Sequence, residues 1–234
     1  MYSTAMLVLA AADTVLVVWL LRHWLARRGL VLSMILFLAA ALPYDTALVG
    51  LGSLIGEGPL LESLSVPRFV LFNLSLPLTI IIAAALARMA GVRWLASRAA
   101  MGAVCVLAMV LLALDWRYVL DPGALYPACW RDTLRYVPSV LAEQACSAGQ
   151  PGIAVASHFP RAGFVALPAL VIAGALVWRQ GRWPWMFAGG MAAFALLGMP
   201  PRLVGPIPGF IGDALNILAL AVTALRFGSR GQSR

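Results

Sequence analysis

The sequence predicts an all-α, polytopic membrane protein: a bundle of seven transmembrane helices with the N-terminus outside and the C-terminus in the cytoplasm. Composition gives the first indication, because 62% of the 234 residues are hydrophobic and only 11% are charged. Ordinary globular domains carry about a quarter charged residues. Length gives the second, because several apolar runs reach the roughly 20 residues that cross about 30 Å of hydrocarbon. The distribution of Arg, described below, gives the orientation.

Hydropathy places seven candidate spans in a single transmembrane domain that covers residues 1–234. The spans are about 4–21, 30–55, 67–90, 99–115, 162–178, 184–199 and 203–225. The first span has no basic flank before it and no small-residue cleavage site after it, so we expect a retained helix rather than a signal peptide. The one sizeable loop is 116–161, which we expect outside the cytoplasm.

Arg is distributed unevenly between the two sets of connecting segments. One set holds eleven Arg and no acidic residue, and consists of 22–29, 88–98, 179–183 and 226–234. The other set holds six Arg and six acidic residues, and consists of 56–68, 115–161 and 200–202. Positive charge in short loops favours the cytoplasmic side. We therefore expect a multi-pass protein of the inner cell membrane.

The net charge of +8 does not predict a nucleic-acid partner, because the Arg residues follow the membrane orientation. All 17 basic residues are Arg, so a retinal Schiff base or a pyridoxal lysine is excluded. His23 and His158 both fall near helix ends, which excludes a bis-His haem inside the bilayer. The sequence has no paired-His metal motif, serine-hydrolase elbow or glycine-rich phosphate loop. We predict no cofactor and no metal site.

Three acidic residues lie inside predicted spans. Counted from the outer ends of their spans, Asp13, Asp45 and Asp213 each come out roughly 16–18 Å deep, near the middle of the hydrocarbon layer. No Arg is expected at that depth. An ionised carboxylate there is costly, so these acids should be protonated, hydrogen-bonded inside the bundle, or in contact with water or a cation.

Polar neighbours of these acids complete the predicted ligand-binding set. The central members are Asp13, Tyr44, Asp45, Asn73, Asp213 and Asn216. In the last span, Gly205, Gly209 and Gly212 share a helical face with Asp213 and Asn216, which favours close helix contact. Two prolines at 206 and 208 leave an alternative, in which the helix breaks and Asp213 caps a shorter helix.

Pro-Arg pairs precede three spans and add Arg68, Arg161 and Arg202 to the candidate site residues. One interpretation is a helix start with Pro in the first turn and an interfacial Arg. The other is a ring of three Arg that binds an anionic head group.

The outer loop contains Cys129 and Cys146, which we expect to form a disulfide, since the loop faces an oxidising compartment. A continuous helix over 131–145 would hold the two sulfur atoms apart, but Pro138 opposes such a helix.

The function expected from these patterns is binding or transport of a small solute, a lipid or a cation or proton through an outward-facing polar cavity. One alternative is a lipid-modifying enzyme at the outer interface, with His158, Glu57 and Glu62 as weak catalytic candidates beside Arg68. Another is a non-catalytic subunit of a larger membrane complex. Expected partners are the lipid bilayer, an anionic lipid or small solute, and further subunits. Enzymatic activity is left open.

Overall fold

The computed structural model of the chain describes residues 1–116, 125–140, 144–146 and 160–228, with the backbone alone at 201–202. Its helices are α1 (Tyr2–Ala26), α2 (Leu30–Ile55), α3 (Pro59–Met89), α4 (Arg98–Leu114), α6 (Arg161–Gly181), α7 (Trp185–Leu197), α8 (Pro201–Val204) and α9 (Ile207–Gly228). A short 3-10 helix, η1 (Arg93–Ala96), precedes α4, and two strands, β1 (Tyr126–Trp130) and β2 (Thr133–Val137), form a hairpin.

Five of these helices are long and apolar enough to cross a membrane: α1, α2, α3, α6 and α9. Two further apolar helices are shorter, with 17 residues in α4 and 13 in α7. The chain is therefore a helical membrane protein. The exact number of crossings, the orientation and the single-domain organisation stay predictions.

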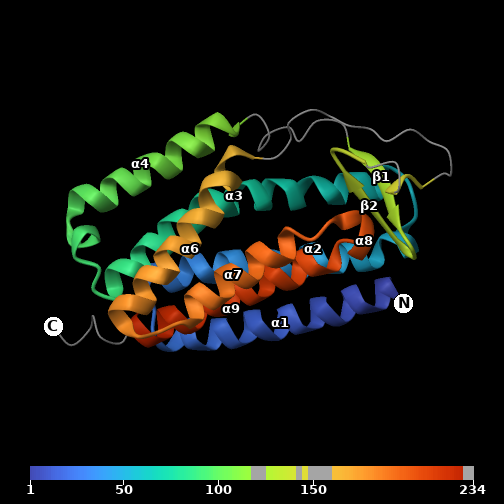
Figure 1. Cartoon of the computed structure of the whole chain (residues 1–234). Helices are drawn as coiled ribbons and strands as arrows, with labels where there is room; N and C mark the ends of the chain where they lie inside the picture. Colours follow the sequence, from blue (N-terminus) through green and yellow to red (C-terminus); the bar gives the residue numbers. More distant parts are fainter. Residues whose placement is uncertain (117–124, 141–143, 147–159, 229–234) are drawn as a thin grey trace.

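Five helices form a closed ring: α2 packs on α3, α3 on α6, α6 on α7, α7 on α9, and α9 on α2. Two helices lie outside the ring, because α1 packs mainly on α2 and α4 packs mainly on α3 (Figure 1). The largest buried apolar cluster draws on all five ring helices, with Leu38, Ile82, Leu170, Met186 and Leu220 as members. The ring therefore has a packed core.

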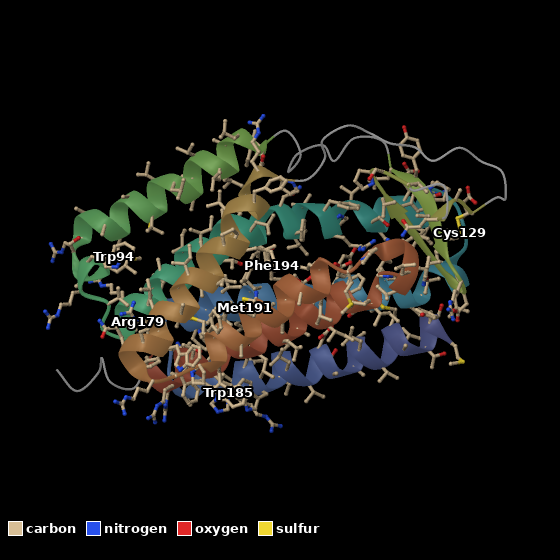
Figure 2. All side chains as sticks on the ribbon, in the orientation of Figure 1. Trp94, Cys129, Arg179, Trp185, Met191 and Phe194 are labelled. Carbon is tan, nitrogen blue, oxygen red and sulfur yellow. A yellow bond between two sulfur atoms is a disulfide. The ribbon has the colours of Figure 1, made fainter. Side chains whose placement is uncertain are left out.

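The two ends of the bundle differ in character. The hairpin and the N-terminus lie at one end, which we call the hairpin end, and the C-terminal part of α9 lies at the other (Figure 1). The connections between α1 and α2, α3 and α4, and α6 and α7 lie at that other end, the Arg-rich end. Arg179, Trp94 and Trp185 are found there (Figure 2). The connecting segments are thus divided between the two ends of the bundle as the Arg distribution predicts.

Two predicted helix starts are wrong. The third helix begins at Pro59 and not at 67, so Pro67 and Arg68 lie inside α3. A Pro removes one backbone donor, but the rest of a long buried helix keeps its hydrogen bonds and tolerates it. In the last span the helix is interrupted at Gly205, whose φ of 71° is suited to glycine. Because α9 then begins at Ile207, Asp213 lies six residues inside the helix and is not its cap.

The outer loop contains structure that the sequence did not predict. β1 and β2 pair antiparallel around a tight turn at Arg131 and Asp132, with Trp130 opposite Thr133. Arg131 adopts a φ of 53°, in the left-handed region that two-residue hairpin turns use. The predicted disulfide is confirmed, since Cys129 of β1 is bonded to Cys146. The bridge ties the segment after the hairpin back onto its first strand.

The hairpin turn docks on the first turn of α1. The Asp132 carboxylate accepts hydrogen bonds from the backbone N–H of Tyr2 at 2.8 Å and of Ser3 at 3.3 Å, and it pairs with the Met1 ammonium. These are donors that a helix start leaves unsatisfied. The Met1 ammonium, together with the backbone donors, lowers the pKa of Asp132 to about 2. The turn therefore caps α1 from another part of the chain.

A second contact holds the hairpin against α2. A Cβ atom on Gly52 would lie 1.8 Å from the carbonyl oxygen of Leu134, so only glycine permits this approach of strand to helix. The Leu134 side chain packs with Leu48, Leu61 and Tyr136 in an apolar cluster between the hairpin and the ends of α2 and α3. The hairpin is thus packed onto the ring helices.

We predict that Gly52→Ala destabilises the docked hairpin. A methyl group cannot be placed without moving the β2 backbone, and such overpacking costs about 1–3 kcal/mol. Gly102→Ala is the matched control, because a Cβ there meets no atom within 4 Å in the exposed face of α4. Thermal unfolding in detergent should show a lower midpoint for Gly52→Ala and an unchanged or higher one for Gly102→Ala. Equal midpoints for Gly52→Ala and wild type would contradict the close contact.

Candidate binding cavity

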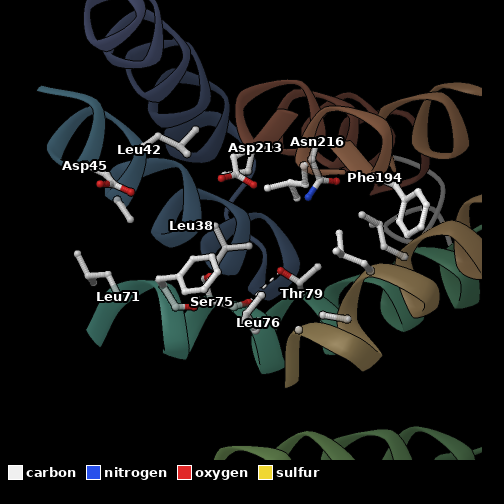
Figure 3. A pocket seen from close by; sticks show the side chains of 18 of the residues that line it. Leu38, Leu42, Asp45, Leu71, Ser75, Leu76, Thr79, Phe194, Asp213 and Asn216 are labelled. Atoms are coloured by element: carbon white, nitrogen blue, oxygen red, sulfur yellow. Dashed lines mark hydrogen bonds between the residues drawn. The ribbon is translucent and has the colours of Figure 1, made fainter. Parts of the chain in front are cut away.

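A cavity of about 430 Å³ lies inside the ring and is lined by residues of α2, α3, α6, α7 and α9. Ligand sites in proteins commonly enclose a few hundred Å³ or more. Most of its wall is apolar, with Leu38, Leu42, Leu71 and Leu76 among the lining residues. Polar groups are few and come from three helices: Asp45, Arg68, Ser75, Thr79, Asp213 and Asn216. Figure 3 shows Asp45 on one side of the view, Phe194 on the other, and Asp213 with Asn216 between them.

Asp45 and Arg68 form an ion pair at the hairpin end of the cavity, through Arg68 Nε and Asp45 Oδ1. They meet because α2 and α3 are antiparallel neighbours joined by a three-residue connection, 56–58. Asp45 lies ten residues before the end of α2, and Arg68 lies nine residues after the start of α3. At about 1.5 Å per residue both positions are about 14–15 Å from the connection. The expectation that no Arg lies at the level of the acids is therefore wrong.

The Arg68 side chain is buried, with 7% of its surface exposed, while 31% of Asp45 remains exposed. Arg68 also lies over the ring of Phe69 at 5.7 Å. Its Nη1 atom is buried and has no hydrogen-bond acceptor among the described residues. The ion pair thus uses the Nε nitrogen of the guanidinium group and leaves the Nη1 hydrogen-bond donors without an acceptor in the described part of the chain.

The hairpin brings a second cation to this pair. Arg135 of β2 lies close enough to Arg68 and Asp45 to interact electrostatically with both. The pKa of Arg135 is lowered to about 10, mainly by burial. Repulsion from Arg68 also lowers this pKa, and attraction to Asp45 raises it. At neutral pH Arg135 stays protonated. Two cations and one carboxylate therefore interact electrostatically at the hairpin end, and of these only Asp45 and Arg68 form an ion pair and line the cavity.

Asp213 and Asn216 lie next to each other on the α9 face of the cavity (Figure 3). In the part of the chain that the structure describes, no side-chain hydrogen bond or ion pair reaches Asp213, and Asn216 Oδ1 is buried without a donor. The hydroxyl groups of Ser75 and Thr79, by contrast, donate to carbonyl oxygens of their own helix at 2.7 and 2.9 Å. Unused acceptors therefore line the α9 side.

The other predicted site residues have structural contacts outside the cavity. Asp13 is buried between α1 and α2, where the Thr46 hydroxyl lies 3.0 Å from its carboxylate. The Tyr44 hydroxyl donates to the Leu64 carbonyl oxygen at 2.6 Å and joins α2 to α3. Asn73 is buried in α3 but is not among the residues that line the cavity.

The predicted Arg ring is not assembled among the described side chains. Arg68 is buried, whereas Arg161 is exposed at the start of α6, and the Arg202 side chain is not described. Of the enzyme candidates, Glu57 and Glu62 are both exposed, and His158 lies outside the described residues, so a catalytic site of these residues stays a prediction. No group of three or more His, Cys, Asp or Glu that could hold a metal occurs in the described ranges.

Sequence reasoning missed Ser75, Thr79 and Arg135 as residues at or beside the cavity. Ser75 and Thr79 are four residues apart on one helical face, a spacing that could have indicated a shared wall. Nothing local distinguishes Arg135 from the other Arg residues of the outer loop. Only the fold of the hairpin brings it beside Arg68.

No family model, curated protein or solved structure matches the chain.

We predict that Asp45→Asn destabilises the protein more than Asp13→Asn does. The first leaves the buried Arg68 cation without its carboxylate, whereas the second keeps an acceptor for Thr46. Removing one partner of a buried pair costs about 3–5 kcal/mol, and we expect the lower part of that range because Asp45 is partly exposed. Thermal or chemical unfolding of each variant in detergent gives the measurement.

The single variant Arg68→Gln and the double variant Asp45→Asn/Arg68→Gln complete the cycle, and the double variant removes both charges. It should recover much of the stability that Asp45→Asn loses, which is the mark of an interaction between the two residues. If the loss of stability in the double variant equalled the sum of the losses in the two single variants, the interaction between Asp45 and Arg68 would not contribute to stability.

Proposed function

We propose that this chain is a small inner-membrane protein that binds a lipid-like molecule in the ring cavity, to hold it or to carry it. The observation that supports the proposal is the character of the cavity, which combines apolar walls with a few polar groups gathered on α2, α3 and α9. An amphiphilic ligand has the same combination, and convergent polar groups in a mostly apolar pocket are typical of small-molecule sites.

Access from the bilayer supports a lipid over a water-soluble solute. Phe72, Phe164 and Phe194, from three different helices, line the cavity and are 38%, 69% and 53% exposed. Aromatic rings that are partly exposed on the bundle surface therefore border the cavity. Such rings contact hydrocarbon readily, whereas a path for a polar solute needs polar groups along it.

Transport of a proton or cation is the second candidate, and Asp213 favours it. Asp213 lines the cavity without a described side-chain partner, as an ion-carrying acid must at some stage. Asp45 no longer supports this candidate, because Arg68 balances its charge. The enzyme and complex-subunit alternatives stay predictions that no contact in the cavity favours.

The proposed topology has seven crossings, with the hairpin end outside and the Arg-rich end in the cytoplasm. The alternation of the connections between the two ends supports it, together with the excess of Arg at one end. The disulfide agrees with an outward hairpin, since stable bridges are usual in oxidising compartments.

We predict that a single cysteine at position 96 is labelled only from the cytoplasm and one at position 139 only from outside. Ala96 and Ser139 are both exposed and lie at opposite ends of the bundle. The background carries Cys105→Ala, and the native disulfide stays intact. Membrane-impermeant maleimide on spheroplasts and on inverted vesicles gives the measurement. Labelling of position 96 from outside would overturn the orientation.

We predict that Ala41→Phe lowers the amount of lipid retained by the purified protein. Ala41 lines the cavity, and a phenyl ring there would fill part of its volume. Ala103→Phe is the matched control, because Ala103 lies on the exposed face of α4 away from the lining. Native mass spectrometry after mild detergent extraction should show bound lipid on wild type and Ala103→Phe, and several-fold less on Ala41→Phe. Equal lipid on the two variants would reject the cavity as the binding site.

A further inference from the structure

The ion pair between Asp45 and Arg68 leaves hydrogen-bond donors of Arg68 unused. Arg68 is more than nine-tenths buried, lines the cavity, and contacts Asp45 through Nε alone. Nη1 has no acceptor among the described residues. A guanidinium group presents five N–H donors in a planar fork that matches the oxygen atoms of a carboxylate or phosphate. Arg68 can therefore bind a second anionic group while it keeps Asp45.

The charge around Arg68 points to the same kind of ligand. Arg135 of the hairpin is a second cation that interacts electrostatically with the pair, while Asp45 forms its ion pair with Arg68. Among the described residues no ion pair compensates Arg135, whose charge burial disfavours. An anion bound at Arg68 would offset this excess of positive charge. Because the surroundings have a low dielectric constant, that attraction is stronger than it would be in water.

Arg68 lies toward the hairpin end of its helix. Asp45 is fifteen residues from Leu30, the Arg-rich end of α2, and Arg68 is twenty-one residues from Met89, the same end of α3. At about 1.5 Å per residue these distances are about 22 and 31 Å. From the connection at the hairpin end the same residues are only about 14–15 Å away. The ion pair thus lies nearer the hairpin end of these two helices than the Arg-rich end.

The rest of the cavity runs from this level into the hydrocarbon. On α3 the lining extends from Arg68 to Thr79, eleven residues or about 16 Å toward the Arg-rich end. On α2 it extends from Asp45 to Leu38 in the same direction. A chain attached to a group at Arg68 would therefore pass between leucine side chains at the depth where lipid tails lie.

Resting on the proposed lipid binding, we infer that Arg68 binds the anionic oxygen-bearing head of an amphiphile, a phosphate or a carboxylate, at the hairpin end of the cavity. Arg135 strengthens this site by its charge, and the apolar wall takes the attached hydrocarbon. Asp45 orients the guanidinium through Nε, so that the remaining donors face the ligand. Free phosphate has the same head-group chemistry, and the experiment below separates the two sources.

The test titrates delipidated protein in neutral detergent with three probes: dioleoyl phosphatidylglycerol, dioleoyl phosphatidylcholine and inorganic phosphate. The two lipids have the same chains and differ in net charge. For the fluorescence readout the oleoyl double bonds of both lipids are brominated, so that bound chains quench tryptophan fluorescence, and calorimetry reports phosphate. Wild type should bind phosphatidylglycerol at least about tenfold more tightly than phosphatidylcholine, as expected for one charge-assisted contact. Phosphate alone should bind far more weakly than the anionic lipid.

Three variants assign the preference to residues. Arg135→Gln removes a cation that has no ion-pair partner among the described residues, and should reduce phosphatidylglycerol binding several-fold while leaving phosphatidylcholine binding unchanged. Asp45→Asn/Arg68→Gln removes the pair without leaving a buried charge, and should abolish the preference between the lipids. Arg161→Gln is the control, because Arg161 is exposed at the start of α6 and does not line the cavity. Helical circular dichroism and the intact disulfide verify the fold of each variant.

The outcomes separate this inference from the proposed function. Equal binding of the two lipids that Ala41→Phe still reduces would overturn the anionic head group and keep the lipid cavity. Phosphate binding that depends on Arg68, without lipid binding, would keep the anion site and overturn the lipid function. No binding of any probe, or a preference that all three Arg variants retain, would overturn the inference.

Discussion

The ion pair between Asp45 and Arg68 is the interaction on which the rest of the arrangement depends. A carboxylate and a guanidinium inside a helical bundle both lose hydration, and each is tolerable chiefly because the other is present. Their contact fixes α2 and α3 in register, since each residue lies nine or ten positions from the short connection between the helices. It also gives the ring cavity a charged end in an otherwise leucine-rich wall. Structure and candidate function therefore share the same two residues.

The hairpin completes this end of the molecule. Glycine at position 52 lets β2 lie directly on α2, the Asp132 carboxylate caps α1, and the disulfide closes the segment after β2 onto β1. These contacts join the outer helix α1, the ring helix α2 and the loop into one unit. Arg135 interacts electrostatically with the ion pair because the strand is held in this position. The charge balance of the cavity thus depends on an element outside the apolar helices.

The three acids within the helices have three different environments, although they lie at similar distances along their helices. Asp13 has a hydroxyl partner, Asp45 has a cation, and Asp213 faces the cavity with no described side-chain partner. Equal depth along separate helices does not bring side chains together, because rotation about each helix axis decides which neighbour a side chain meets. Asp213 and Asn216 consequently remain the acceptors available to a ligand, while Asp13 stabilises the packing of α1.

The sequence by itself determined the helical membrane character, the separation of Arg-rich from acidic connections, and the pairing of Cys129 with Cys146. These depend on composition, on segment length and on where Arg, acidic residues and Cys stand in the sequence, all of which are local properties of the chain. The partner of Asp45 was decided only by tertiary structure, because helix α3 continues through Pro67 and carries Arg68 inward. The hairpin, the position of Arg135 and the exclusion of Asp13, Tyr44 and Asn73 from the cavity were also decided there. Each of these depends on contacts between segments far apart in sequence and on helix rotation, which hydropathy and spacing do not encode.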